Sequence, residues 1–215
     1  MYEQRFLNAD ADEWRGIWRE LSRFLQRYVP GDATVLELAC DRGGFINHIK
    51  AAERWAVDVR DVRKHLDPDV TFLQGDGLHL DDRVASSSID VVFMSNYLEH
   101  LESAQAVVEQ FRVIRKLLRP GGSVIVLQPN IRLVGGSYWD FLDHRTPLTE
   151  KSLEEAGNTA GLETIDLITR FFPYTTKSRL PRHYALVRAY LAFRPAWLVL
   201  GRQSLYVARR PAEAS

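Results

Sequence analysis

The chain has 215 residues, of which 46% are hydrophobic, and its 28 lysine or arginine residues balance 28 aspartate or glutamate residues. This composition is typical of one globular domain, 1–215, that folds without disulfides or a structural metal. Cys40 is the only cysteine, which excludes an internal disulfide framework. The acidic N-terminus does not read as a signal peptide, and no run approaches 18 apolar residues. We therefore expect a cytoplasmic protein, and the zero net charge gives no general argument for nucleic-acid binding.

The first predicted element is an amphipathic helix within residues 1–30, which Asp10 or Asp12 is placed to cap. Its apolar face carries Trp14, Ile17, Trp18, Leu21, Phe24 and Tyr28. Four short apolar segments then predict buried parallel strands at residues 34–38, 54–59, 70–74 and 89–94. A helix starting at Gly43 is expected between the first two.

The second half of the chain continues this alternation of helices and strands. A helix is predicted from Tyr97 to Leu118, then a strand at 123–128 and a loop at 129–148 whose length points to function. Thr149 is the expected cap of the next helix, with Leu148 and Leu153 as a hydrophobic staple and Gly161 as the stop. Strands at 162–169 and 203–209 flank an insertion at 171–202. The pattern predicts an α/β three-layer sandwich with a mostly parallel sheet.

Three acidic residues stand at the ends of three successive predicted strands. Glu37 ends the first, Asp58 follows 21 residues later, and Asp76 follows the third strand. Ligands of parallel sheets bind beyond the carboxyl ends of the strands, and a carboxylate in the position of Asp58 can accept hydrogen bonds from both ribose hydroxyls of a nucleoside. Asp76 could accept from an adenine amino group. Each acid alone could be a solvated carboxylate, but the ordered set predicts a nucleoside-containing cofactor.

At this point the sequence resembles the class I S-adenosylmethionine-dependent methyltransferases, from about Val35 to Arg210. The segments that carry the resemblance are VLELACDRGGF, AVDV, LQGDG, IDVVFMSNYLEHL and LLRPGGSVIVLQPN. The resemblance implies a seven-stranded Rossmann-like sheet, with the last strand antiparallel between strands five and six, and S-adenosylmethionine as cofactor. It places the cofactor against Glu37, Ala39, Asp41, Gly43, Asp58, Val59, Asp76, Gly77 and Asn96.

The loop after the first strand departs from the pattern of that family, which is acid-x-Gly-x-Gly-x-Gly. Ala39 and Asp41 replace two of the glycines, and Asp41 adds a negative charge where the methionine end of the cofactor would pass. A non-catalytic or repurposed methyltransferase-like binding domain is therefore an alternative. A nicotinamide-binding Rossmann protein is another, but it needs a G-x-G-x-x-G string, and none follows the first strand.

Methyl transfer from a sulfonium is an in-line displacement, so the protein must mainly align the partners and exclude water, although a base assists a hydroxyl acceptor. His100 is the first candidate for that base and His144, in the long loop, the second; packing or capping roles are the alternatives. Asn96, Glu99 and His100 resemble the cation cluster of quinone O-methyltransferases, but Asn96 stands where a carboxylate is expected, and we predict no metal. SNYL in place of Asn-Pro-Pro-Tyr favours transfer to a hydroxyl of a small, glycan or lipid-linked acceptor.

The C-terminal part of the chain is strongly basic. Residues 167–212 hold nine basic, no acidic and eight aromatic residues, whereas residues 1–166 hold 19 basic and 27 acidic residues. With a helix at about 182–194, the insertion could lie on an anionic membrane surface or bind a lipid-linked acceptor, which would make the protein peripheral to the inner membrane. Binding of RNA is a less favoured alternative. The insertion could instead be a capping helix whose arginines pair with the acidic body. The DHRTPLTEKSL segment at 143–153 and the FFPYTTKSRLP segment at 171–181 together resemble a bacterial subgroup of small-molecule or O-methyltransferases.

Overall fold

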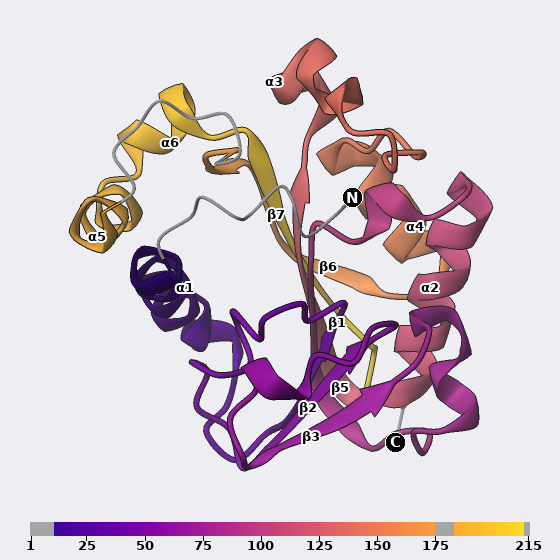
Figure 1. Ribbon diagram of the computed structural model, residues 1–215. Coiled ribbons are helices and arrows are strands. Elements are labelled where there is room, and N and C mark those ends of the chain that lie inside the picture. The colour runs from indigo at the N-terminus through magenta and orange to yellow at the C-terminus, as the bar shows by residue number, and fades with distance from the viewer. Residues whose placement is uncertain (1–10, 175–182, 213–215) are drawn as a thin grey trace.

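The computed structural model describes residues 11–174 and 183–212 and contains one seven-stranded sheet in the order β3-β2-β1-β4-β5-β7-β6 (Figure 1). The strands are β1 (Thr34–Leu38), β2 (Glu53–Asp58), β3 (Val70–Gln74), β4 (Ile89–Ser95), β5 (Leu118–Pro129), β6 (Glu163–Phe172) and β7 (Gln203–Arg209). β1 to β5 pair in parallel, and β7 is antiparallel to both β5 and β6. The predicted fold class and the place of the last strand are confirmed. The strand order reverses between β1 and β4, which is where such sheets bind ligands.

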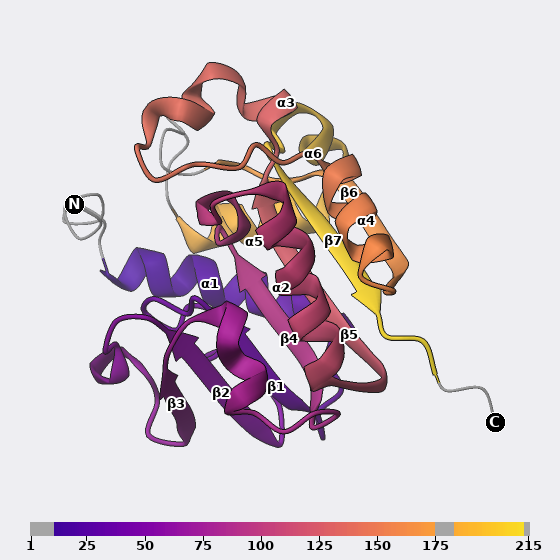
Figure 2. The ribbon, with the colours of Figure 1, turned by 90° about the vertical axis from the view of Figure 1, so that its right-hand side faces the viewer.

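Helices cover both faces of the sheet, so the three-layer arrangement is confirmed. One face carries α1 (Ala11–Leu25), α5 (Tyr184–Ala192) and α6 (Pro195–Leu200), and the other carries α2 (Ala104–Leu117) and α4 (Glu150–Thr159) (Figures 1 and 2). Shorter helices are η2 (Gln26–Tyr28), η3 (Arg63–His65), η4 (Gly77–Asp82), η5 (Leu98–His100), α3 (Ile131–Val134) and η6 (Gly135–Asp140). β1 is buried on both sides because Leu36 packs in one core and Val35 in the other.

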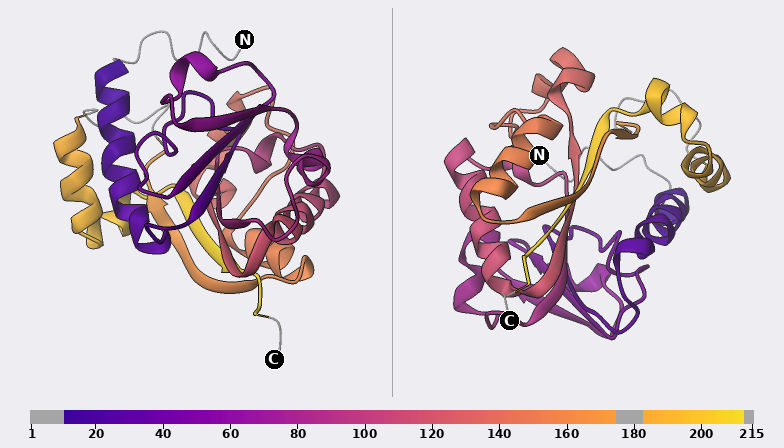
Figure 3. Two further views of the ribbon diagram at one scale, coloured as in Figure 1. Left: turned by 90° about the horizontal axis from the view of Figure 1, so that it is seen from below. Right: turned by 180° about the vertical axis from the view of Figure 1, so that it is seen from behind.

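The N-terminal and C-terminal parts of the chain meet where α1 and α5 lie side by side (Figure 3). The helices approach closely at Gly16, where an added Cβ would lie 2.9 Å from the Cβ of Tyr184. The guanidinium of Arg19 stands 5.4 Å from the centre of the Tyr184 ring. Of the two predicted caps of the first helix, Asp12 falls inside α1 and Asp10 lies outside the described residues. Within the described residues, no helix is both long and apolar enough to cross a bilayer.

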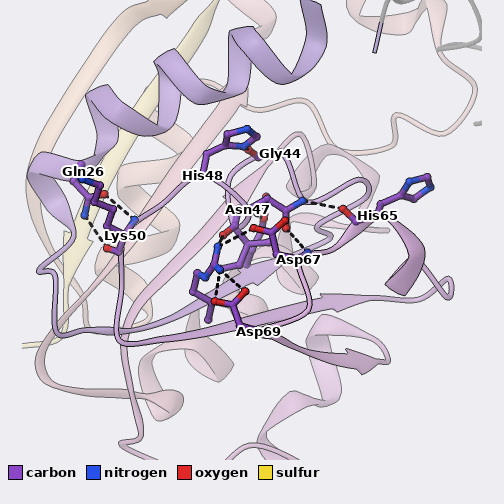
Figure 4. Close-up of polar contacts among 11 residues, drawn as sticks. Gln26, Gly44, Asn47, His48, Lys50, His65, Asp67 and Asp69 are labelled. Atoms are coloured by element: carbon purple, nitrogen blue, oxygen red, sulfur yellow. Dashed lines mark hydrogen bonds and ion pairs between the residues drawn. The ribbon is translucent and has the colours of Figure 1, made fainter. Parts of the chain in front are cut away.

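The helix expected from Gly43 is not formed. Residues 41–48 make consecutive turns, with single bonds such as Asn47 N–H to the Gly43 carbonyl. Side chains hold this segment instead: Asn47 donates to the His65 carbonyl at 2.8 Å and accepts from the Asp67 N–H at 3.0 Å (Figure 4). Gln26 exchanges two hydrogen bonds with the backbone of Lys50. The segment contains two glycines, which disfavour a helix, and it is too short before β2 for a stable regular helix. Hydrogen bonds to segments distant in sequence therefore fix its conformation.

The helix expected at Tyr97–Leu118 is shorter than predicted. Ser103 caps α2 by accepting from the Ala106 N–H, and the residues before it form η5. β5 already begins at Leu118, which pairs with Ile89 of β4, and the 119–122 segment also contacts the residue after β7, Gly121 N–H donating to the Arg210 carbonyl.

The predicted start of α4 is confirmed in detail. Thr149 and Ser152 form a capping box, Leu148 and Leu153 are both buried, and Gly161 has a φ of +79° just past the helix end. The predicted helix at 182–194 corresponds to α5 and is followed by the unpredicted α6, while residues 175–182 of the insertion lie outside the described residues.

Candidate active site

A cavity of about 800 Å³ lies beyond the carboxyl ends of β1, β2 and β4, bordered by α1 and by the loop after β5. It brings together nearly all of the predicted site residues: Glu37, Ala39, Asp41, Asp58, Val59, Asp76, Gly77, Asn96, His100 and His144 line it. Gly43 is not among the lining residues. An added Cβ at Gly43 would meet Leu66 at 2.6 Å and Asn47 at 2.7 Å, so this glycine permits close packing behind the loop. Gly44 lines the cavity instead, with the Trp18 ring against it.

The loop after β1 has the backbone shape of a glycine-rich loop without most of the glycines. Ala39, Asp41 and Gly43 have φ values of +52°, +47° and +69°, so every second residue is left-handed. This region is costly for alanine, while aspartate tolerates it better. The alternation explains why glycine is favoured at these positions in similar sequences, and it shows that the two substitutions have kept the course of the chain.

Arg60 compensates the negative charge that Asp41 adds. Its Nη2 lies 2.9 Å from Asp41 Oδ1, and its Nε lies 3.1 Å from Asp58 Oδ1. Asp58 also accepts the backbone N–H groups of Arg60 and Asp41, at 2.9 and 3.0 Å. Although burial opposes it, the hydrogen bond and charge of Asp58, followed by those of Asp41, raise the pKa of Arg60. Sequence reasoning missed Arg60; its position two residues after Asp58, at the end of β2, was the available signal.

Glu37 is buried at the floor of the loop. Its Oε2 accepts the Ile46 N–H at 2.8 Å, which anchors the 43–46 turn to β1. Burial raises the pKa of Glu37 to about 8, and the charges of Asp41 and Asp58 act in the same direction, against the hydrogen bonds from Ile46 and Phe45. With a pKa of about 8, Glu37 is mostly protonated at neutral pH. A cationic ligand beside it would favour the carboxylate.

The remaining predicted cofactor residues line the cavity just after the ends of β2, β3 and β4. Asp76 caps η4 by accepting the Leu78 N–H at 3.1 Å, and Val59 is 65% exposed. At Gly77 an added Cβ would lie 2.6 Å from the Tyr97 hydroxyl. Asn96 has a φ of +48°, and its N–H donates to the Leu127 carbonyl, which turns the chain sharply at the end of β4. The exposed apolar side chain of Val59, between the carboxylates of Asp58 and Asp76, is a surface against which the face of an aromatic base can pack.

The two histidines meet at the opposite end of the cavity, with ring centres 5.2 Å apart. His100 Nδ1 lies 3.0 Å from the Asp143 carbonyl, so Nδ1–H is the donor and Nε2 keeps its lone pair. The long loop is held against η5 because the Glu99 carbonyl accepts the N–H groups of Arg145, at 2.8 Å, and Thr146, at 3.1 Å. These bonds explain how residues more than 40 positions apart in sequence share one site.

Glu99 completes this end of the cavity. It is 1% exposed, its Oε2 accepts from Gln128 Nε2 at 3.0 Å, and burial raises its pKa while the neighbouring His100 opposes that rise. One ligand atom each of Glu99, His100 and His144 lie within 4.8 Å of one another, a set that could hold a cation. The sequence had grouped Glu99 and His100 with Asn96; the structure places His144 beside them instead.

A family model described as a methyltransferase domain matches residues 10–167. The chain belongs to this methyltransferase family. Solved structures show the same fold: an S-adenosylmethionine-dependent methyltransferase from Archaeoglobus fulgidus has 16% identity and a TM-score of 0.67 over 91% of this chain and 94% of its own. The family match and the shared fold together make the protein a member of a methyltransferase family with the fold of the S-adenosylmethionine-dependent methyltransferases.

Two further solved structures share the fold of this methyltransferase. A complex from Haloferax volcanii between the Trm112 methyltransferase activator and a methyltransferase matches with 18% identity and a TM-score of 0.65, over 90% of both chains. The [4+2]-cyclase SpnF matches with 19% identity and a TM-score of 0.62, over 90% of this chain and 81% of its own. A search of curated proteins found no match.

Proposed function

We propose that this methyltransferase transfers a methyl group from S-adenosylmethionine to a hydroxyl group. The observation that carries the proposal is one cavity lined both by the carboxylates of Glu37, Asp58 and Asp76, which end or follow β1, β2 and β3, and by the imidazoles of His100 and His144, which follow β4 and β5 on the other side of β1 in the sheet. The adenosine would lie along Asp58, Val59 and Asp76, and the methionine end along the loop after β1. The sulfonium methyl would then face the histidine end, where an acceptor approaches in line.

Cofactor binding requires Asp58 to exchange partners. Its carboxylate is occupied by the Arg60 side chain, whereas ribose hydroxyls would need the same oxygen atoms. The Arg60 side chain is 40% exposed and also bonds Asp41, so it can leave Asp58 without losing its second carboxylate. We infer that Arg60 holds the loop in shape until the cofactor replaces it on Asp58.

His100 is the better placed of the two candidate bases. Its Nδ1–H is fixed by the Asp143 carbonyl, so Nε2 can accept the hydroxyl proton while the oxygen attacks the methyl carbon. A His100→Gln variant should lower kcat by about a hundredfold or more with little change in cofactor affinity. The assay is transfer of labelled methyl groups from S-adenosylmethionine to a panel of small hydroxyl compounds, glycans and lipid extracts. An unchanged kcat would remove His100 from this role.

A repurposed binding domain is the second candidate, because the loop departs from glycine at Ala39 and Asp41, Arg60 occupies Asp58, and the same fold occurs in a cyclase. Calorimetric titration separates the candidates. Binding of S-adenosylmethionine at micromolar concentration with 1:1 stoichiometry is expected for the enzyme. Absence of binding at millimolar concentration would support the second candidate.

The outer face of α1, α5 and α6, which we call the basic apolar face, supports a lipid-linked acceptor and a cytoplasmic protein peripheral to the inner membrane. Leu186 and Phe193 are 50% and 62% exposed, and Leu198 and Val199 are each 70% exposed, so four large apolar side chains within residues 184–200 face solvent. Residues 183–202 contain no acidic side chain. Exposed arginines of these elements are Arg15, Arg19 and Arg23, four residues apart on α1, Arg27 on η2, Arg188 on α5 and Arg194 at the start of α6.

The inner side of α1 lines the cavity with Trp14 and Trp18, so the helix that carries part of the basic apolar face also borders the site. Flotation with vesicles of anionic and of neutral lipids tests the proposal: binding should need anionic lipid and should fall at least tenfold in a Leu198→Asp variant. Ile165→Asp, at an apolar residue of β6 that is 51% exposed, is the matched control. Equal binding to both kinds of vesicle, or tighter binding to RNA than to lipid, would contradict it.

A further inference from the structure

The cluster of Glu99, His100 and His144 has the composition of a metal site. It contains one carboxylate and two imidazoles, and their ligand atoms lie within 4.8 Å of one another. Glu99 is 1% and His144 8% exposed, so two of the three groups are shielded from water, yet all three line the cavity. Nitrogen and carboxylate ligands from two chain segments thus converge at the acceptor end rather than at the cofactor end.

Other groups fix the orientation of each potential ligand. The Asp143 carbonyl accepts from His100 Nδ1, which directs the Nε2 lone pair away from that bond, and Gln128 holds one oxygen of Glu99. The Tyr138 and Phe141 rings pack against His144, with centres 4.8 and 5.0 Å from its ring. A carbonyl behind a histidine ligand and an amide behind a carboxylate ligand are the outer-shell partners that metal sites use.

Backbone contacts also fix the two ligand-bearing segments relative to each other. In addition to the two bonds to the Glu99 carbonyl, Thr146 Oγ1 donates to the Leu101 carbonyl at 2.6 Å, and the Tyr138 hydroxyl donates to the Thr146 carbonyl at 2.5 Å. In a tetrahedral site with bonds of about 2.1 Å, ligand atoms are about 3.4 Å apart. The ligand atoms of Glu99, His100 and His144 lie within 4.8 Å of one another, so side-chain movements of up to about 1.4 Å would bring each pair to this separation.

We propose that Glu99, His100 and His144 bind a divalent first-row transition-metal ion, with an open coordination position facing the cavity. Two imidazoles and one carboxylate suit Zn²⁺ or Mn²⁺ better than Mg²⁺ or Ca²⁺, which prefer oxygen ligands. The role of the ion rests on the proposed function: an acceptor hydroxyl bound in the open position would lose its proton to solvent water near neutral pH. The oxygen–methyl bond then forms as the carbon–sulfur bond of the sulfonium breaks. With the ion bound, it activates the hydroxyl in place of the His100 imidazole.

The experiment titrates chelator-treated full-length protein with Zn²⁺ by calorimetry and with Co²⁺ by visible absorption. One Zn²⁺ per chain at micromolar or tighter affinity is expected, and Co²⁺ should give the absorption of a four- or five-coordinate site. His144→Ala and Glu99→Gln should each weaken Zn²⁺ binding at least tenfold. His65→Ala, at an exposed histidine of η3, should leave it unchanged. Absence of Zn²⁺ binding at millimolar concentration, or equal binding by wild type and His144→Ala, would overturn the proposal.

Binding of S-adenosylhomocysteine, measured in parallel, shows that each variant is folded, because the cofactor end of the cavity does not include these three groups. The same measurement separates the two proposals. If metal-free protein binds the cofactor and methylates a hydroxyl at its full rate, the proposed role of the ion in the reaction is wrong and the proposed function stands. If Zn²⁺ binds as described but no S-adenosylhomocysteine binds, the proposed function is wrong and the metal site stands.

Discussion

The two ends of the cavity are built in different ways. At the cofactor end, Glu37, Asp58 and Asp76 each stand at or just past the end of the strand that positions them, so neighbouring parallel strands bring them together. At the acceptor end, η5 and the loop after β5 meet through the hydrogen bonds of Arg145 and Thr146 to the Glu99 carbonyl. The first end therefore follows from the order of strands, whereas the second depends on contacts that the strand order does not determine.

The largest effect is expected at Glu37. Between its ordinary pKa of 4.5 and its raised pKa of about 8, the folded protein holds a proton that the unfolded chain has lost, so stability falls as pH rises through this window. Between pH 5 and pH 8.5 the wild-type protein should lose up to about 4 kcal/mol more unfolding free energy than the Glu37→Gln variant loses. Urea denaturation at both pH values measures it. If the unfolding free energies of wild type and Glu37→Gln change equally with pH, Glu37 does not have the raised pKa described.

The second effect concerns Asp58. Asp58→Asn should weaken S-adenosylmethionine binding about a hundredfold, because the variant lacks the carboxylate that would accept charge-assisted hydrogen bonds from the ribose hydroxyls. Calorimetric titration measures the affinity. Asp61→Asn, at an exposed neighbour paired with Arg63, is the matched control and should change affinity less than threefold. If both variants bind alike, the cofactor end is wrongly assigned.

A smaller effect is expected from the loop contacts of the acceptor end. Thr146→Val removes the buried hydrogen bond to the Leu101 carbonyl while keeping the shape of the side chain. We expect a loss of about 1.5 kcal/mol in unfolding free energy, since the carbonyl is left without its donor. Affinity for S-adenosylhomocysteine should stay within twofold. Equal losses of stability and cofactor affinity would mean that the two ends are not separate units.

The smallest effect is expected at Ala39. Its left-handed backbone costs about 1 to 2 kcal/mol for alanine, and glycine removes this cost but gains freedom in the unfolded chain. Ala39→Gly should therefore stabilise the protein by about 0.5 to 1 kcal/mol in urea denaturation. Gly161→Ala, which places alanine at a φ of +79°, should do the reverse. Destabilisation by Ala39→Gly would show that the methyl group contributes more through packing than it costs in strain.

The sequence predicted the elements whose signals are local. All seven strands, the Thr149 cap and the Gly161 stop follow from runs of apolar residues, a capping side chain and a left-handed glycine. The turns after Gly43 were mistaken for a helix because Asn47 and Gln26 bond to segments distant in sequence. Arg60 was overlooked because Asp41, one of its two carboxylate partners, lies 19 positions away on the loop after β1.

By itself, the sequence determined the α/β class, the order of elements and the three acids at the cofactor end, because period-2 and period-3.6 patterns and strand ends are properties of neighbouring residues. Only the tertiary structure decided that Arg60 neutralises Asp41, that Gly43 packs behind the loop, and that His144 lies beside His100 and Glu99. These pairings join residues 19 to 45 positions apart. They depend on how segments pack, and no periodicity along the chain records which distant side chains will meet.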